Sequence, residues 1–392
     1  MKQRLADWRR NEKEEDEEYK ARYPNEDLSD RLALKAIDYR RQYESIWARV
    51  FGSFDTTTPI GPMCFNSEPV PSHAQVYDTL QIFSVRIKEI RQGLQWPLHV
   101  FGVIAARDSV DHNRNIIFKR ERDNCQTLTQ EDPCLLLTGP TRAVVVCDPV
   151  YFEVALKVEG SIKSEDKDLS LLTVPLTAAS YIPHTCLFSK DYTSRLSTLE
   201  LAYGYVVNSM EATIHVHITE ESWPDGTYGQ FTAHTSSLRD EEILLLDSRC
   251  EKMIVNDDGM IKLSRCVASV EAEGELQVSV VAFGRDNDER KIKVVGNDDK
   301  DFTPKKTGKS TGTLNVGFCK MDVTVYWSLL SLVSAECPTK SDNGHASSAT
   351  KSDNGHASSA TKSDDGHASS DTKSGNDHAS SDLCAVAGAS GV

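Results

Sequence analysis

Apolar and polar side chains alternate through the middle of this chain, most clearly in the stretch 116–160. Within Phe152–Val158 the apolar side chains share one parity, and Glu153 and Lys157 take the other. A period of two predicts a strand with one face in a core and the other face in water. The same stretch predicts further strands at Ile116–Lys119, Leu135–Thr138 and Ala143–Val158, the last broken at Asp148-Pro149.

A similar plan recurs later in the chain. Trp96-Pro97 precedes Phe101-Gly102, and Trp223-Pro224 precedes Tyr228-Gly229 at the same spacing. The shift between these motifs carries Ile104 onto Phe231, and a slightly smaller shift carries Arg142 onto Arg265 and Leu156 onto Val280. Self-similarity over such a distance indicates two similar β units. Chance likeness between two β-rich stretches is the alternative.

Short, regularly spaced strands separated by turn residues favour a mainly β fold of two antiparallel sandwich-like units over βαβ units. A closing strand is expected at Lys320–Trp327. The expected limits are a charged arm (1–28), an amphipathic helix (29–53), a linker (54–74), a first β unit (75–185), a second β unit (195–332) and a disordered repeat tail (333–392).

Before the β units, an apolar stripe at helical spacing runs from Leu32 to Val50. Its members are Leu32, Ala36, Tyr39, Tyr43, Ile46 and Val50. Such a stripe predicts an amphipathic helix. Either the helix docks on the β body, or it binds a partner.

The tail repeats an eleven-residue unit, TKSDNGHASSA, with small changes between 339 and 382. Ser, Asp, Asn, Gly and Lys bury too little apolar surface to offset the entropy lost on ordering. A disordered spacer or a serine-rich phosphorylation substrate is expected. Metal binding by the spaced histidines of a floppy chain would be weak.

The formal charge of −15 and pI near 5.2 argue against general phosphate-backbone binding, so nucleic acid is not an expected partner. The ten cysteines form no CxxC pair, which disfavours a zinc ribbon. No secretory signal or membrane-length apolar run is visible. We therefore expect a cytoplasmic or nuclear protein that is not secreted, with free thiols, some of them in the core, such as Cys147.

Several arrangements suggest chemistry without supporting it. Gly308-Lys309-Ser310 resembles the end of a phosphate-binding loop, but no helix pattern follows. His215 and His217 share one strand face but lack an evident third metal ligand. Four acidic residues loosely resemble calcium loops, although solvated turns explain them equally well: Asp108, Asp111, Asp123 and Asp132. No catalytic, cofactor-binding or metal-binding residue is therefore assigned, no cofactor is expected, and enzymatic activity is uncertain, with the balance against it.

The stretches WPLHVFGVIAARD, NRNIIFKRERDNCQTLTQEDPCLLLTGPTRAVVVCDPVYFEVALKVEG, SRLSTLE and TLNVGFCKMDVTVYWSLLS together resemble the plant domain of unknown function numbered 6598. The resemblance runs from about Leu80 to Leu332. It implies a plant, stress-associated context. In some relatives this domain follows a ribosome-inactivating N-glycosidase domain, as in jasmonate-induced proteins. The Glu-x-x-Arg helix of that glycosidase has no counterpart here, and the resemblance carries no functional residues over.

Two functions are compatible with these observations. The first is a non-enzymatic β-sandwich module for interaction or regulation in plant stress or defence, with a protein partner and no membrane. The alternative is a defence-related enzyme, or an accessory of a ribosome-inactivating system.

Overall fold

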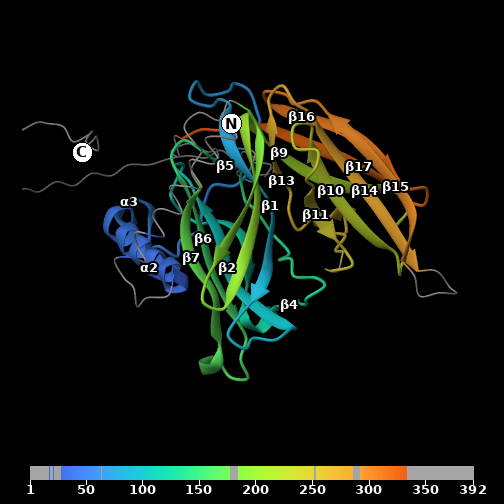
Figure 1. The fold of residues 1–392 in the computed structure, drawn as a ribbon. Coiled ribbons are helices and arrows are strands. Elements are labelled where there is room, and N and C mark those ends of the chain that lie inside the picture. The colour runs from blue at the N-terminus through green and yellow to red at the C-terminus, as the bar shows by residue number, and fades with distance from the viewer. Residues whose placement is uncertain are drawn as a thin grey trace, which may run out of the picture. The chain divides into compact units, whose positions relative to one another are not determined.

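The computed structural model describes residues 17, 21, 28–62, 64–176, 184–250, 253–285 and 292–332. This part of the chain is mainly antiparallel β, with helices only near its start, as the sequence pattern predicted (Figure 1). The helices are α2 (Leu28–Ile46) and α3 (Ala48–Phe51), and single 3-10 turns lie at Arg122–Asn124 and Lys163–Glu165. None of the described helices combines the length and apolarity needed to cross a membrane. The predicted tail, 333–392, and most of the charged arm fall outside the described residues.

The described strands form three sheets. The first cover sheet has the order β3-β2-β6-β7, with β4 beside β2: β2 (Leu98–Arg107), β3 (Asn115–Arg120), β4 (Gln126–Leu128), β6 (Val150–Val158) and β7 (Lys167–Leu176). The second cover sheet has the order β11-β10-β14-β15: β10 (Tyr228–Thr235), β11 (Ile243–Asp247), β14 (Leu276–Arg285) and β15 (Ile292–Phe302). The third, or shared, sheet contains β1 (Tyr77–Ile90), β5 (Val144–Val145), β8 (Cys186–Thr193), β9 (Ser197–Glu220), β12 (Met260–Ile261), β13 (Val267–Glu271), β16 (Gly308–Asn315) and β17 (Lys320–Ser328).

Strand β9 is 24 residues long and runs through both ends of the shared sheet. Its first half pairs with β1 and β8, and its second half pairs with β13, β12 and β17. Between the halves, Asn208 has a φ of 45°, in the left-handed region where asparagine is enriched. The backbone amide of Asn208 donates to Asp78 Oδ1 of β1 at 2.9 Å, which ties this point of β9 to β1.

Two large apolar cores lie on the shared sheet, one under each cover sheet. The first contains Phe152, Val154 and Leu156 of β6 together with Leu199 and Leu201 of β9. The second joins residues of β10, β14, β17 and the later half of β9, among them Phe231, Val280, Trp327 and Ile214. The predicted parity of β6 is confirmed on its core side, where these residues are fully buried.

The strands around the two cores pair in the same order. The order β5-β1-β9-β8 in the first half of the shared sheet matches β13-β9-β17-β16 in the second, and β3-β2-β6-β7 matches β11-β10-β14-β15. Leu156 lies opposite Gly102, whereas the residue opposite Gly229 is Ala282. The sequence alignment of Leu156 with Val280 is therefore two residues out of register. A two-residue slip keeps every side chain on its own face, so the apolar pattern alone could not detect it.

The matched tryptophans lie just before β2 and β10, as the repeated motif predicted. Each packs against its own core, but Trp96 and Trp223 are only partly buried. The glycines that follow these tryptophans, Gly102 and Gly229, lie where a side chain would clash with its surroundings. A Cβ on Gly102 would come within 2.1 Å of the Ala155 carbonyl oxygen, and one on Gly229 within 2.9 Å of the Trp223 ring.

Some of the predicted strands, and the expected burial and free state of the cysteines, differ from the structure. The expected closing strand at Lys320–Trp327 is β17, whereas Leu135–Thr138 forms no strand. Strand β8 and the first half of β9, which follow the expected first β unit of 75–185, pack in the first core. Cys147 is exposed, not a core residue, since β5 ends at Val145 and leaves it in a turn. Of the cysteines in the described part of the chain, seven are free, but Cys64 is disulfide-bonded, so the expectation of free thiols fails there.

Candidate functional site

The acidic residues considered as calcium ligands do not converge on a cation site. Asp108 and Asp111 do come together, but around the guanidinium of Arg142, whose nitrogens lie 2.6 Å from Asp108 Oδ2 and 3.1 Å from Asp111 Oδ1. Thr58 donates to Asp111 at 2.5 Å, and the Val145 amide donates to Asp108 at 2.9 Å. Asp123 lies in a 3-10 turn and Asp132 in an exposed turn elsewhere. The pair therefore forms a structural ion cluster.

The two arginines aligned by the sequence have different surroundings. Arg142 has two buried carboxylates, which raise its pKa. Arg265 is also buried, but its guanidinium donates to the carbonyl oxygens of Ile82 and Phe83 at 2.6 and 3.4 Å. Burial lowers the pKa of Arg265 to about 10, because among the described residues no carboxylate pairs with it. The second β unit therefore lacks the ion cluster of the first.

His215 and His217 lie on one face of β9, as predicted, yet each ring has a separate neighbour. His215 packs edge-on against Tyr326 with ring centroids 5.1 Å apart. His217 Nε2 lies 2.5 Å from the carbonyl oxygen of Asp258. In the described part of the chain no group of three or more His, Cys, Asp or Glu is placed to hold a metal. We therefore interpret His215 and His217 as side chains on the surface of the sheet.

The helical arm docks on the outer face of the first cover sheet, mainly against β7 (Figure 1). Ala36 and Tyr43 are buried, and Tyr39 stacks on Tyr151 of β6 with ring centroids 4.3 Å apart. The Tyr43 hydroxyl donates to Asn113 Oδ1 at 3.0 Å. The first four members of the predicted stripe, Leu32 to Tyr43, thus face the sheet, and the docking interpretation of the helix is confirmed.

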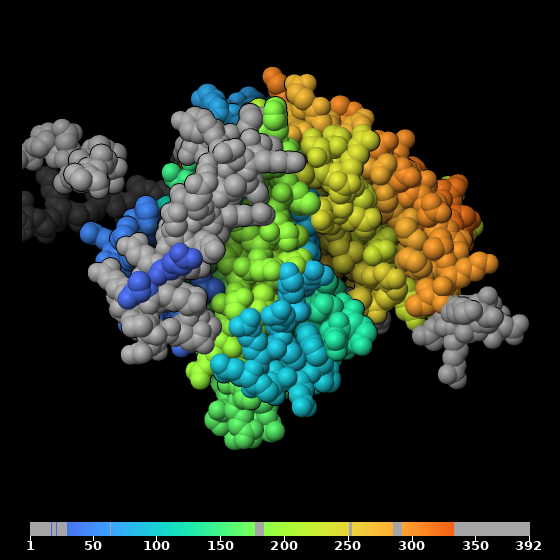
Figure 2. All heavy atoms as spheres, viewed as in Figure 1, coloured from blue at the N-terminus to red at the C-terminus, as the bar shows by residue number. Residues whose placement is uncertain are grey.

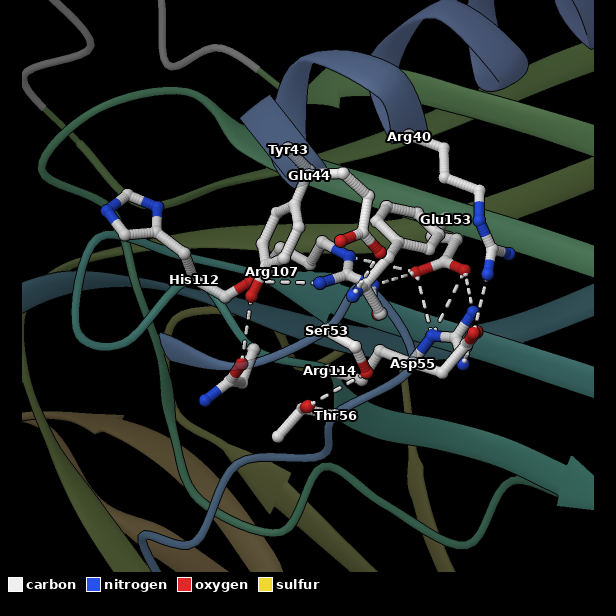
Figure 3. A network of polar contacts seen from close by, with 12 residues as sticks. Arg40, Tyr43, Glu44, Ser53, Asp55, Thr56, Arg107, His112, Arg114 and Glu153 are labelled. Atoms are coloured by element: carbon white, nitrogen blue, oxygen red, sulfur yellow. Dashed lines mark hydrogen bonds and ion pairs between the residues drawn. The ribbon is translucent and has the colours of Figure 1, made fainter. Parts of the chain in front are cut away.

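A buried ion cluster holds this end of the arm (Figure 3). Glu153 of β6 was expected to face water, but it is buried and accepts from two arginines. Its Oε2 lies 2.9 Å from Arg107 Nε, and its Oε1 lies 2.5 Å from Arg114 Nη2. The alternation correctly placed Glu153 opposite the core, but it could not show that a helix and a loop cover that side.

Phe54, in the predicted linker, packs against the arginines of this cluster. Three guanidinium carbons lie near its ring centroid, at 4.0 Å for Arg107, 4.9 Å for Arg40 and 5.2 Å for Arg114. Such cation–π contacts are strongest where water is excluded. The Phe54 carbonyl accepts from Arg107 at 2.5 Å, and its amide donates to Glu44 Oε1 at 2.8 Å. The segment after α3 is therefore anchored to the sheet.

Beyond this anchor, the apolar stripe continues past the sheet. Ile46 and Val50 are 59% and 72% exposed, and Trp47 is 36% exposed. Phe51 and His112 complete the group, which we call the arm patch: Ile46, Trp47, Val50, Phe51 and His112. The sequence placed Ile46 and Val50 on the docking stripe, but the sheet beneath ends before them.

The aromatic rings of the arm patch pack against one another. The indole of Trp47 stacks on the imidazole of His112, with centroids 3.9 Å apart and an interplanar angle of 17°. Phe51 meets His112 edge-on at 5.2 Å. Partial burial lowers the pKa of His112, so the stacked imidazole is favoured in its neutral form. The patch is therefore an aromatic and aliphatic surface on an element fixed by buried ion pairs.

Nothing in the sequence pattern marked Trp47, Phe54 or the arginine pair as parts of one site. One signal was available in the sequence. Arg107 and Asp108 in the first half align with His234 and Thr235 in the second. Arg107 and Asp108 are the residues that take part in the ion clusters of the first half. The arrangement offers no nucleophile beside a base. It offers a rigid apolar surface of the kind that binds macromolecules.

The fold and the site define an antiparallel, mainly β protein that carries a helical arm on one sheet. Residues 79–325 match the model of the domain of unknown function DUF6598. The match covers more than half of the chain, and the protein belongs to this family, which confirms the resemblance seen in the sequence. No curated protein matches it.

Among solved structures, the chain is similar to human GIVD cytosolic phospholipase A2, with 10% identity, a TM-score of 0.22, and coverage of 65% of this chain and 33% of that one. It is also similar to the tandem C2 domains, A and B, of extended synaptotagmin 2, with 10% identity, a TM-score of 0.22, and coverage of 70% and 99%. This chain therefore spans about a third of the phospholipase. Likeness at this level carries no argument about function.

Proposed function

We propose that this protein is a non-enzymatic interaction module of plant stress or defence, and that it binds a protein partner through the arm patch. The observation that carries the proposal is the exposure of Ile46, Trp47 and Val50 on an arm held by the buried Glu153 cluster. Tryptophan among aliphatic neighbours is a frequent anchor of protein interfaces. A fixed arm also loses little conformational entropy on binding.

The architecture proposed with this function is a pair of β-sandwich units related by internal duplication. Matching strand orders around the two cores support it. The tail is proposed to be a flexible spacer or a phosphorylation substrate, a proposal supported by its repeat composition alone.

Substitution at the arm patch tests the function. The double variant Ile46→Glu/Val50→Glu should leave the free energy of unfolding nearly unchanged, because both side chains are more than half exposed. It should lose the partners that the wild-type chain retains in affinity capture from plant extract. A partner identified in this way and purified should bind the double variant at least about tenfold more weakly, which corresponds to roughly 1.4 kcal/mol.

The matched control is Ile162→Glu, which replaces another exposed apolar residue at 58% exposure, in the turn after β6. It should retain the same partners. If the double variant keeps every partner at wild-type strength, or if the control loses them equally, the arm patch is not the binding surface.

The competing function, an accessory or enzyme of a ribosome-inactivating system, is suggested by the family resemblance. A depurination assay on ribosomes separates the two, with the chain alone and with an added N-glycosidase domain. We expect no depurination by the chain alone and no change in the rate of the added domain. A rise in either rate would favour the competing function.

A further inference from the structure

The two cover sheets have the same strand order but differ in what lies on their outer faces. On the first, α2 lies along β7 and contacts Tyr151 of β6. On the second, β14 and β15 take the places of β6 and β7, and the described helices lie elsewhere (Figure 1). In Figure 2 the orange atoms of these later strands form open surface at the right. Among the described residues, no helix covers the place on the second sheet that α2 occupies on the first.

Strand pairing orders the residues on this outer face into rows. Val278, Val280 and Ala282 of β14 are buried in the core, so the alternate residues point outward. At one end, Phe283 lies between Tyr228 of β10 and Val294 of β15. Towards the other end, the ladder places Ser279 opposite Asp299 and Gln277 opposite Asp301. The face is therefore apolar at one end and acidic at the other.

The apolar end is open to solvent. Val294 is 49% exposed, and Ile292, two residues before it on the edge strand, is 54% exposed. The Phe283 ring is partly buried beneath the guanidinium of Arg249, whose central carbon lies 4.6 Å from the ring centroid. Contiguous apolar side chains at a sheet edge mark a surface where another element docks.

The acidic end carries charge without a cation. Asp299 and Asp301 both accept hydrogen bonds from Gln277 Nε2, at 3.1 and 3.0 Å. Among the described residues no Lys, Arg or His pairs with either carboxylate. On the first sheet the corresponding end is neutralised by Arg107 and Arg114 around Glu153. On the second sheet, cations would have to come from what binds there.

We propose that the outer face of β14 and β15 is a second docking surface, which takes an amphipathic helix of a partner protein. This helix is apolar where it meets Phe283 and Val294, and rich in Lys or Arg on the same side where it meets Asp299 and Asp301. The strand rises about 3.3 Å per residue, so the two ends of the face are roughly 23 Å apart. A helix of about 15 residues spans that length, and α2, with 19 residues, covers the equivalent face of the first sheet.

The probe for the test is a designed, fluorescently labelled 16-residue helical peptide. Leu and Tyr form one side of its first two turns, and Lys continues the same side over the last two. Anisotropy titration against the full chain should show saturable binding. A second peptide, with Glu in place of each Lys, should bind at least about tenfold more weakly, because like charges would meet at Asp299 and Asp301.

Four variants locate the site. Val294→Asp should weaken the Lys peptide at least about tenfold, whereas Ile254→Asp, at a residue of 47% exposure outside this face, should leave its binding unchanged. The double variant Asp299→Lys/Asp301→Lys should reverse the preference between the two peptides. Circular dichroism would check that each variant folds, and Val50→Glu in the arm patch should have no effect on either peptide.

Equal binding of the two peptides, no binding of the Lys peptide, or binding unaffected by Val294→Asp would each overturn the proposal. Sedimentation at increasing concentration gives one more check. A rise in mass that Val294→Asp abolishes would mean that a second copy of this chain covers the face, which also overturns it. Because the arm patch is not involved, failure here leaves the proposed function standing, and failure of the arm patch leaves this surface standing.

Discussion

Trp327→Ala is expected to destabilise the protein by about 3–5 kcal/mol, the range for truncating a buried large aromatic residue. Trp327 on β17 is 0% exposed. Its indole Nε1 donates to Ser310 Oγ of β16 at 3.0 Å. Truncation removes the largest side chain of the second core and also leaves the Ser310 hydroxyl without this donor. Urea unfolding of the wild type and the variant measures the loss.

The other tryptophans provide the comparison. Trp96 and Trp223 are only partly buried, so their alanine variants should lose clearly less than Trp327→Ala. Trp47→Ala, on the arm patch, should change stability least. If Trp96→Ala or Trp223→Ala proved more costly than Trp327→Ala, the positions assigned to these side chains would be contradicted.

Glu153→Gln should cost about 3–5 kcal/mol, because it leaves the buried guanidinium of Arg107 without its counter-charge. Arg114 loses one of two carboxylate partners and keeps Asp55, at 2.8 Å. Arg107 is 1% exposed and lies directly under the arm. The loss should appear together with earlier tryptic cleavage at Arg49 of α3, since the Phe54 loop that follows packs on the same arginines. Denaturant unfolding and limited trypsin digestion, followed in parallel, give both readouts.

Asp38→Asn is the control for Glu153→Gln. Asp38 pairs with Arg41 on the solvent side of α2, with both side chains more than half exposed, and exposed pairs contribute little. Replacing Glu153, Arg107 and Arg114 together by apolar residues should recover part of the loss, because no charge then remains buried. An arm that stays protected in Glu153→Gln would show that the ion cluster does not hold it.

The sequence supported those features that depend on local pattern. Alternation identified β6 and β17, and helical spacing identified α2, because one face of each lies in a core. The repeated Trp-Pro and aromatic-Gly motifs indicated that two stretches follow one plan. These inferences needed only the neighbours of each residue along the chain.

The parts that the sequence did not predict depend on contacts between distant segments. Glu153 looked like a solvent-facing residue, since nothing near it in sequence shows that Phe54 and Tyr43 cover it. Ile46 and Val50 looked like docking residues, because the helical period does not show where the sheet beneath them ends. Arg142 and Arg265 were aligned in the sequence, yet only the folded chain shows that carboxylates pair with Arg142 and that, among the described residues, none pairs with Arg265.

Strand β9 has a consequence for how the protein can be divided. Because one continuous strand completes both cores, no cut through its 24 residues leaves two self-sufficient fragments. A cut at Asn208 would leave each half of β9 with its own pairing strands, but it would take Phe65, Phe83 and Val206 away from the second core. The apolar surface exposed in this way would favour aggregation. The smallest portion expected to fold from this gene therefore contains both halves, and recombination or insertion is best tolerated outside residues 197–220.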